Sequence, residues 1–244
     1  HGGGGRLQNQ LIHDRILPRL RNDVLAEMAD AARLELPSNA VCFTTDSYVV
    51  KPLFFRGGDI GKLAVCGTVN DLAVSGARPV ALSLALIIEE GFEFALLDKI
   101  LQSIGAAAEH NRVRIVTGDT KTVDHGAADG LFINTAGIGV RLPNVELGWS
   151  RIEVGDRILL NGSLGDHGMT IVSQREGISF ESPLTSDCAG LAELTCALFE
   201  NVPGIKFMRD PTRGGLAATL NEVVKGSRRS IELEERAIPV KPTV

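Results

Sequence analysis

Apolar strand-like runs alternate with amphipathic helix-like segments between residues 41 and 141, and this alternation limits the chain to a few folds. Strands appear as short runs rich in β-branched and aromatic residues, whereas helices show apolar residues three and four positions apart. Strands are predicted at 41–50, 78–88, 113–118 and 130–140, and helices at 60–77 and 92–111. Elements in this order are typical of an α/β or α+β layered domain.

A second unit follows a looser stretch between Gly148 and Asp156, where we expect a domain boundary. The N-terminal domain would span 1–148 and the second domain 149–244. Strands are predicted there at 157–162 and 205–210, and helices after 168, over 186–201 and after 215. The final segment offers little sheet material, so we expect an α/β domain that is short of strands. A further helix is predicted after the opening glycines, limited by Pro18.

Composition argues against several classes of protein. The 244 residues carry a formal charge of −5 with both signs interspersed, so nucleic acid is not an expected partner. No apolar run approaches the roughly 20 residues that span a bilayer, and the start does not resemble a signal peptide, so no membrane association is expected. The cysteines are scattered without CxxC pairs, which favours reduced thiols in a cytoplasmic protein. They are Cys42, Cys66, Cys188 and Cys196.

Asp46 interrupts a segment, "VCFTTDSYVV", that otherwise has the composition of a core strand. Aspartate disfavours strand interiors, and burial of an unpaired charge is costly. Asp119 repeats the arrangement in "IVTGDTK", after an apolar strand and before a hydroxyl residue. Acids on strands that converge at one sheet edge form a site for a hard divalent cation. With Asp30 and Asp71 they make a four-acid pattern, which we expect to face one cleft and to bind Mg²⁺ with a nucleotide.

Each aspartate also has a structural interpretation. An isolated Asp before Ser or Thr is usually a turn or N-cap residue; Asp30 alone could cap a helix, and Asp71 alone could be solvated. The chain has no GxxxxGK[ST] motif and no strand-linked GxGxxG motif, so neither a P-loop nor a Rossmann fold is supported. The opening "HGGGG" is either an unstructured end or a flexible loop whose backbone amides cover phosphates.

The predicted helix at 60–77 has two different faces. The apolar face holds Val65, Val69, Leu72 and Gly76, and the roughly opposite polar face holds Thr68, Asp71 and Ser75. One face can therefore pack on the sheet while the other lines a polar cleft. Lys62, near the start of the helix, and Lys121, just after Asp119, are candidate cations for phosphates or for the reaction centre.

Two motifs in the second domain, "NGSLGDHGM" and "MRDPTRGGL", place glycines and polar groups where helices are predicted to begin. The free amides and the dipole at a helix start favour an anion. The candidates for such an anion site are Asp166, His167, Asp210, Thr212 and Arg213. The alternatives are that Asp166 caps a helix, that His167 is a hydrogen-bonded structural residue, and that Arg213 pairs with Asp210.

Together these motifs resemble the HypE family of hydrogenase maturation factors. The resemblance runs through the whole chain, and its most specific part is "FTTDSYVVKPLFFRGGDIGKLAVCGTVNDLAVSGARP". It is also carried by "HGGGGRL", "IVTGDTKTV", "FINTAGIGV", "LGDHGM", "SDCAGL", "RDPTRGGL" and "AIPVKPTV". The relatives of this family are ATP-dependent enzymes of the aminoimidazole ribonucleotide synthetase-like superfamily, which includes selenophosphate synthetase and thiamine-monophosphate kinase.

The resemblance implies a PurM-like two-domain fold, in which the N-terminal sheet pairs with that of a second copy in a barrel-like homodimer. ATP and Mg²⁺ are expected in a cleft beside the N-terminal domain. By the superfamily motif the metal and phosphate-side acids are Asp30, Asp46, Asp71 and Asp119. The ATP-binding set also includes Gly2, Gly3, Gly4, Gly5, Thr45, Lys62, Thr68, Asn70 and Thr120. Lys121 resembles a family residue proposed to assist proton removal, and is the expected catalytic residue.

The resemblance also implies a reaction. The carbamoyltransferase HypF loads a carbamoyl group onto a C-terminal cysteine, ATP activates the carboxamide oxygen as a phosphate ester, and loss of phosphate leaves a thiocyanate. The cyanide passes to iron on the HypC–HypD complex and becomes a ligand of [NiFe]-hydrogenase.

The family continues beyond "PVKPTV", so we expect a truncated chain with an incomplete C-terminal domain, without the cysteine tail and inactive as given. None of its four cysteines matches the acceptor. The alternatives are a selenophosphate synthetase or small-molecule kinase of the same superfamily, and a non-catalytic dimeric maturation scaffold.

Overall fold

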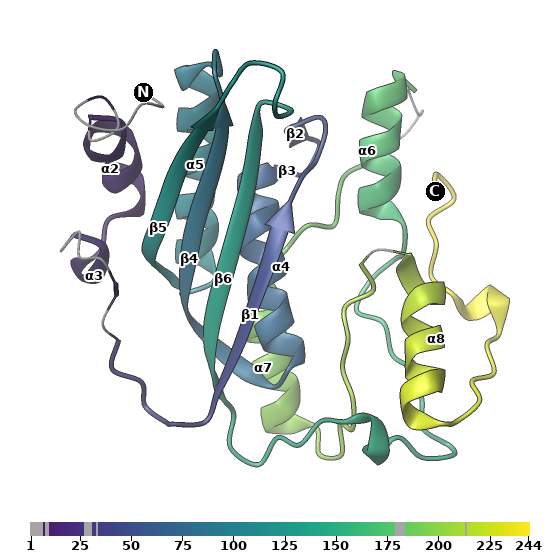
Figure 1. The fold of residues 1–244 in the computed structure, drawn as a ribbon. Helices are drawn as coiled ribbons and strands as arrows, with labels where there is room; N and C mark the ends of the chain where they lie inside the picture. Colours follow the sequence, from purple (N-terminus) through teal and green to yellow (C-terminus); the bar gives the residue numbers. More distant parts are fainter. Residues whose placement is uncertain (1–6, 8–9, 27–30, 33, 179–183, 213) are drawn as a thin grey trace.

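A four-stranded mixed sheet with two long helices on one face forms the first half of the molecule (Figure 1). The computed structural model describes residues 7, 10–26, 31–32, 34–178, 184–212 and 214–244. The strands, in order across the sheet, are β1 (Val41–Tyr48), β6 (Leu131–Arg141), β4 (Ala77–Glu89) and β5 (Arg114–Val123). The long helices are α4 (Ile60–Val74) and α5 (Phe94–His110), and the short pair β2 (Phe54–Phe55) and β3 (Gly58–Asp59) precedes α4. The elements predicted between 41 and 141 are confirmed, in a sheet that is not closed.

The helix predicted after the opening glycines is present in three short pieces. They are the π-helical turn η1 (Ile12–Ile16), α2 (Leu17–Leu20) and α3 (Asp23–Ala26). Pro18 lies in the first turn of α2, directly after the π-helical turn.

The register of the sheet fixes which side chains share a level. Asp46 in β1 lies opposite Thr135 in β6, Thr135 lies opposite Leu84 in β4, and Leu84 lies opposite Gly118 in β5. Directly paired residues point to the same face of a sheet, and successive residues of one strand point to opposite faces. Asp46 therefore shares the face of the buried Leu84, whereas Asp119 points to the other face.

The core lies between the sheet and α4 and α5. The apolar face predicted for α4 is confirmed, because Val65, Val69 and Leu72 are at most 1% exposed. Asp59 caps the N-terminus of α4, accepting hydrogen bonds from the backbone N–H groups of residues 61 and 62. Gly61 lets the two helices approach closely, since a Cβ there would lie 2.7 Å from Ile104 of α5.

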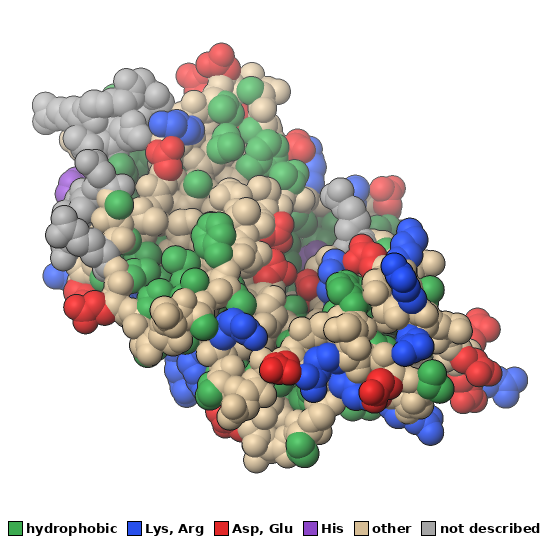
Figure 2. All heavy atoms as spheres, turned by 60° about the horizontal axis from the view of Figure 1, so that its bottom comes forward, with side chains coloured by type: hydrophobic (Ala, Val, Ile, Leu, Met, Phe, Trp, Pro, Cys, Tyr) green, Lys and Arg blue, Asp and Glu red, His purple; other side chains and the backbone are tan. Residues whose placement is uncertain are grey.

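The second face of the sheet, called here the open face, is covered by no described element of the chain (Figure 1). Phe43 of β1 is 68% exposed, and Val41 and Ile87 are also exposed on this face. The expectation that segment 41–50 is a core strand is therefore wrong: β1 is an edge strand, and an edge strand tolerates a carboxylate such as Asp46. Figure 2 shows hydrophobic side chains gathered on part of the surface, while charges of both signs alternate elsewhere.

The second half consists of helices joined by long irregular segments. Its elements are η2 (Trp149–Arg151), α6 (Asp166–Glu176), α7 (Ala192–Asn201), α8 (Gly215–Ser227) and η3 (Glu235–Ala237). The predicted helices are confirmed, but the strands predicted at 157–162 and 205–210 are wrong. A strand requires a hydrogen-bonded neighbour, and among the described residues neither segment has one. Leu159, for example, is 89% exposed.

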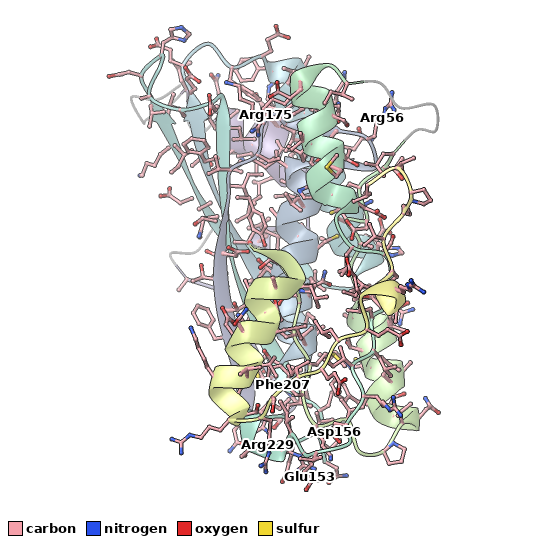
Figure 3. All side chains as sticks on the ribbon, turned by 90° about the vertical axis from the view of Figure 1, so that its right-hand side faces the viewer. Arg56, Glu153, Asp156, Arg175, Phe207 and Arg229 are labelled. Carbon is pink, nitrogen blue, oxygen red and sulfur yellow. The ribbon has the colours of Figure 1, made fainter. Side chains whose placement is uncertain are left out.

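The segment around residue 207 is held by side chains at one end of the molecule (Figure 3). The rings of Trp149 and Phe207 stack with centroids 4.3 Å apart. Lys206 forms ion pairs of 2.7 Å with both Glu153 and Asp156, and this pairing raises the pKa of the lysine. No helix among the described residues is long and apolar enough to cross a membrane.

Candidate functional site

Polar side chains gather where the edge strand β1 passes α4. Thr44 donates a hydrogen bond of 3.0 Å from its hydroxyl to the carboxylate of Asp71. Two residues further along the same face, Asp46 accepts the backbone N–H of Ser47 at 2.9 Å. Tyr48 completes the row, and its hydroxyl lies 3.2 Å from that of Thr68. β1 and α4 together therefore bring two of the predicted acids into one neighbourhood.

Asp210 joins these acids from the segment that precedes α8. Burial raises the pKa of Asp71, and the negative charges of Asp210 and Asp46 raise it further. The hydrogen bond from Thr44 and the positive charge of Arg209 act in the opposite direction. We call Asp46, Asp71 and Asp210 the acidic edge. Asp46 comes from β1, Asp71 from α4 and Asp210 from the segment before α8. The acidic edge therefore forms only when both halves of the chain are folded.

Asp119 does not join the acidic edge. β5 and β1 are opposite edges of the sheet, three strand spacings or roughly 14 Å apart, and Asp119 points to the open face. Its carboxylate lies 3.6 Å from the ammonium group of Lys121 and accepts the backbone N–H of Thr120 at 2.8 Å. We expected all four predicted acids to face one cleft. For Asp119 this expectation is wrong within a single chain. Asp30 lies outside the described residues.

Two predicted nucleotide ligands have partners inside the protein. Thr68 is fully buried between α4 and the sheet, where its hydroxyl contacts those of Tyr48 and Thr135. Asn70 uses both ends of its amide on the second half of the chain, donating to the carbonyl of Ala189 at 3.0 Å and accepting the N–H of Leu191 at 2.8 Å. Both side chains therefore have structural roles in the folded chain, and their contact with a nucleotide stays a prediction.

Of the other predicted nucleotide ligands, Thr45 and Thr120 lie on opposite faces of the sheet. Thr45 is exposed on the open face and donates to the carbonyl of Thr135, and the Thr120 side chain is buried. Lys62 donates a hydrogen bond of 2.9 Å to the carbonyl of Gly57. Gly2, Gly3, Gly4 and Gly5 lie outside the described residues.

The anion-site candidates of the second half do not form one group. Asp166 is 2% exposed and pairs with Lys241 and Ser163, so its charge is already compensated inside the protein. His167 lies 2.9 Å from the hydroxyl of Ser186, and burial lowers its pKa. Asp210 belongs to the acidic edge and Thr212 lies two residues beyond it, whereas Arg213 is outside the described residues.

Sequence reasoning missed four contributors to this site: Thr44, Tyr48, Gly67 and Arg209. Thr44 and Tyr48 lie two positions before and after Asp46, so strand alternation alone would have placed them on its face. Gly67 admits the Tyr48 ring, because a Cβ there would overlap the tyrosine hydroxyl. Arg209 could not have been found from spacing, since it acts on Asp71 across more than half the chain.

The acidic edge fits a cation that arrives with phosphates. Magnesium typically takes one or two protein carboxylates and completes its shell with water and substrate phosphates. The mutual repulsion that raises the pKa of Asp71 would be relieved by such a cation. Within the described ranges no three His, Cys, Asp or Glu side chains are grouped closely enough to hold a metal by themselves. Asp46 and Asp71 could supply the one or two protein carboxylates that such a magnesium shell takes.

Comparison with known proteins identifies the family. Two family models match, AIR synthase related protein, N-terminal domain, over residues 28–141, and the corresponding C-terminal domain over 153–243. The carbamoyl dehydratase HypE of Azotobacter vinelandii is 51% identical over 244 residues, which are all of this chain and 72% of that protein.

Solved structures of HypE proteins also match this chain. A crystal structure of the hydrogenase maturation protein HypE in complex with ATP matches with a TM-score of 0.96 and 48% identity, covering 99% of this chain and 72% of that one. A HypE–HypF complex matches with a TM-score of 0.82 and 45% identity, covering 98% of this chain and 76% of that one. The chain therefore belongs to the HypE family of carbamoyl dehydratases, with the two-part fold of the AIR synthase related proteins.

Proposed function

We propose that this protein binds Mg-ATP at the acidic edge and uses it to dehydrate a carbamoylated C-terminal cysteine to a thiocyanate. The observation that carries the proposal is the near-complete match, at a TM-score of 0.96, to a HypE structure solved with ATP. The product would supply cyanide ligands to the iron of [NiFe]-hydrogenase. The cysteine is expected on a C-terminal tail like that of longer family members.

The side chains of the acidic edge have distinct roles in this proposal. Asp46 and Asp71 hold the cation, and the hydroxyl of Thr44 keeps the Asp71 carboxylate oriented. Bound Mg²⁺ would neutralise charge on the transferred phosphoryl group. Arg209, paired with Glu222 at 2.8 Å, limits the repulsion around Asp71. Because an amide oxygen is a poor leaving group, its phosphorylation is the step that makes dehydration possible.

Lys121 is proposed as the group that takes the amide proton, with Asp119 beside it. Both lie on the open face, away from the acidic edge of the same chain. If two copies pair through their open faces, these residues lie at the subunit interface. A homodimer is therefore part of the proposal, and HypF and the HypC–HypD complex are the proposed partners. The match to a HypE–HypF complex supports the first of these.

Isothermal titration with Mg-ATP tests the proposal directly. Asp46→Asn and Asp71→Asn should each weaken binding at least about tenfold, because each removes a charge from the cation site. Glu109→Gln, at the exposed end of α5, is the matched control and should leave the affinity unchanged. Wild-type affinity in both aspartate variants would contradict the proposed site, and undetectable binding by the wild-type protein would favour a non-catalytic scaffold.

Activity is tested by adding the cysteine tail of a longer family member. With HypF, carbamoyl phosphate and ATP, the tailed protein should release phosphate and gain the mass of a cyano group in place of a hydrogen. Replacing the tail cysteine by Ser should abolish both signals. Phosphate release without any change in the tail would instead support a kinase acting on a small molecule.

A further inference from the structure

Two thiols from different halves of the chain meet beside α4. Cys66 lies in the middle of α4, and Cys188 lies in the segment that leads into α7. The two thiol groups lie close enough to interact with each other. Cys66 is 3% exposed, whereas Cys188 is partly exposed, so the pair sits just below the surface.

The backbone on both sides of Cys188 is fastened to the first half of the chain. Ser186 donates its N–H to the carbonyl of Arg56 at 2.9 Å, and its hydroxyl accepts the N–H of Cys188 at 3.1 Å. On the other side the Asn70 amide binds the backbone of Ala189 and Leu191. The position of Cys188 is therefore fixed by backbone contacts that do not involve its sulfur.

The same contacts fix the face of α4 that meets this segment. Cys66 and Asn70 are four residues apart in α4 and therefore lie on one face of the helix. Gly190 packs so closely on Asn111 that a Cβ would overlap the amide of that side chain. With Asn70 as anchor, the neighbouring turn of α4 presents Cys66 to Cys188.

Charges around the pair make Cys66 the more acidic thiol. The hydrogen bond from Cys188 lowers the pKa of Cys66, and the ammonium group of Lys62, one turn earlier on α4, lowers it further. Burial and the carboxylate of Asp59 act against this. The pKa of Cys188 is raised by the bond to Cys66 and by burial, with Asp187 adding to the effect and Lys62 opposing it. The lowered pKa of Cys66 and the raised pKa of Cys188 assign the attacking role to Cys66 and the resolving role to Cys188.

We propose that Cys66 and Cys188 form a redox modification site, at which a peroxide converts the two thiols into a disulfide that joins α4 to the segment before α7. The Cys66 thiolate attacks one peroxide oxygen, the O–O bond breaks, and sulfenic acid and hydroxide (or an alkoxide) form. The sulfur of Cys188 then displaces hydroxide from this sulfenic acid, and the proton of Cys188 leaves with it as water. With hydrogen peroxide, two thiols and one peroxide give one disulfide and two waters. The inference does not depend on the proposed nucleotide chemistry.

The other two cysteines provide matched controls. Cys42 lies on the edge strand β1, and its sulfur is 4.0 Å from the carbonyl of Ser75. Cys196 is buried in α7, where burial raises its pKa. Neither has a second thiol beside it among the residues that the structure describes.

Peptide mapping by mass spectrometry under non-reducing conditions tests the proposal. After treatment of the native protein with hydrogen peroxide, we expect a linked peptide containing Cys66 and Cys188, which dithiothreitol separates. Cys42→Ser and Cys196→Ser should keep this link. Cys66→Ser should abolish it, and Cys188→Ser should leave a sulfenic acid at Cys66 that dimedone captures. Absence of the linked peptide in the wild-type protein, with Cys66 recovered as a thiol or sulfinic acid, overturns the proposal.

A second variant tests whether the native contact produces the reaction. Asn70→Ala removes the anchor beside Cys188 without removing either thiol, so the link should form several-fold more slowly. The rates are compared at equal peroxide concentration, with circular dichroism showing that both proteins are folded. An unchanged or faster rate would mean that the disulfide forms from a chain opened at this junction, and would refute the native thiol pair.

Discussion

At the scale of single residues, the charged form of Asp71 lowers the stability of the fold, although the proposed cation site requires that charge. Its pKa is raised by burial, Asp210 and Asp46, so the folded state holds a proton more tightly than the unfolded state does. The free energy of unfolding therefore falls as pH rises from the ordinary aspartate pKa, 3.8, through the higher folded value. A residue kept at such a cost is typical of functional sites.

Asp71→Asn should therefore stabilise the protein at pH 7 while it weakens Mg-ATP binding. We expect the free energy of unfolding to rise by roughly 0.5–1 kcal/mol, after allowance for the partial exposure of the carboxylate. The measurement is urea denaturation at pH 7 and at pH 4, where the advantage should shrink because wild-type Asp71 becomes protonated. Glu109→Gln should change stability by less than about 0.5 kcal/mol at either pH. A destabilised Asp71→Asn protein at pH 7 would show that the carboxylate stabilises the fold.

His167 makes an opposite contribution to the pH dependence. Burial lowers its pKa below the ordinary 6.5, although the nearby Asp187 acts against this, and its ring contacts Ser186 and the edge of Phe55. The unfolded chain then binds more protons between the two pKa values, so stability is lost as pH falls through this window. His167→Asn should lose less stability than the wild-type protein between pH 7.5 and 5.5. Equal losses in parallel urea titrations would exclude His167 as the cause.

The sequence was informative about which residues carry charge and less so about where they point. Asp46 and Asp71 were found from their unusual settings, and the structure brings them together with Asp210. Asp119 has the same local pattern as Asp46 but points to the other face. Strand order and register decide this, and both depend on long-range pairing that no local pattern records.

At the scale of elements, periodicity predicted the helices and strands that contribute to the core. Segments 157–162 and 205–210 show its limit, because they have strand composition but no neighbouring strand among the described residues. Trp149 and Phe207 instead hold the second of these segments through ring stacking. We keep the proposed domain boundary near residue 148, seven residues beyond the end of β6 at Arg141.

Gly118 is the position where the packing of β5 on β4 is most sensitive. A Cβ at Gly118 would overlap the backbone carbonyl of Leu84, which cannot move without disturbing the parallel pairing beside an irregularity at Leu82 and Ser83. Gly118→Ala should therefore lower the free energy of unfolding by about 1–3 kcal/mol. Gly168, inside α6, has nothing within 4 Å of the corresponding point, and Gly168→Ala should be neutral or stabilising. Similar urea midpoints for both variants would contradict this view of the sheet.

At the scale of the whole molecule, the described residues cover one face of the sheet and leave the other uncovered. Helices α4 and α5 cover the first face (Figure 1). The open face exposes the side chains of Phe43, Val41 and Ile87. Exposed apolar side chains of this size on a sheet face are candidates for an interaction surface. Asp119 and Lys121, which have roles in the proposed reaction, lie on this face. A protein that binds the open face would therefore affect activity as well as solubility.

The proposed homodimer makes a prediction that belongs to this scale. Phe43 is the most exposed large apolar side chain of the open face, so Phe43→Glu would place a charge on the face through which two copies are proposed to pair. We expect size-exclusion chromatography with light scattering to show a wild-type dimer and a Phe43→Glu monomer at micromolar concentration. Val154→Glu changes a residue that is 90% exposed but lies outside the sheet, and this variant should remain dimeric. If Phe43→Glu stays dimeric while Val154→Glu dissociates, the subunits meet through the second half of the chain. Asp119 and Lys121 would then need another route to the nucleotide.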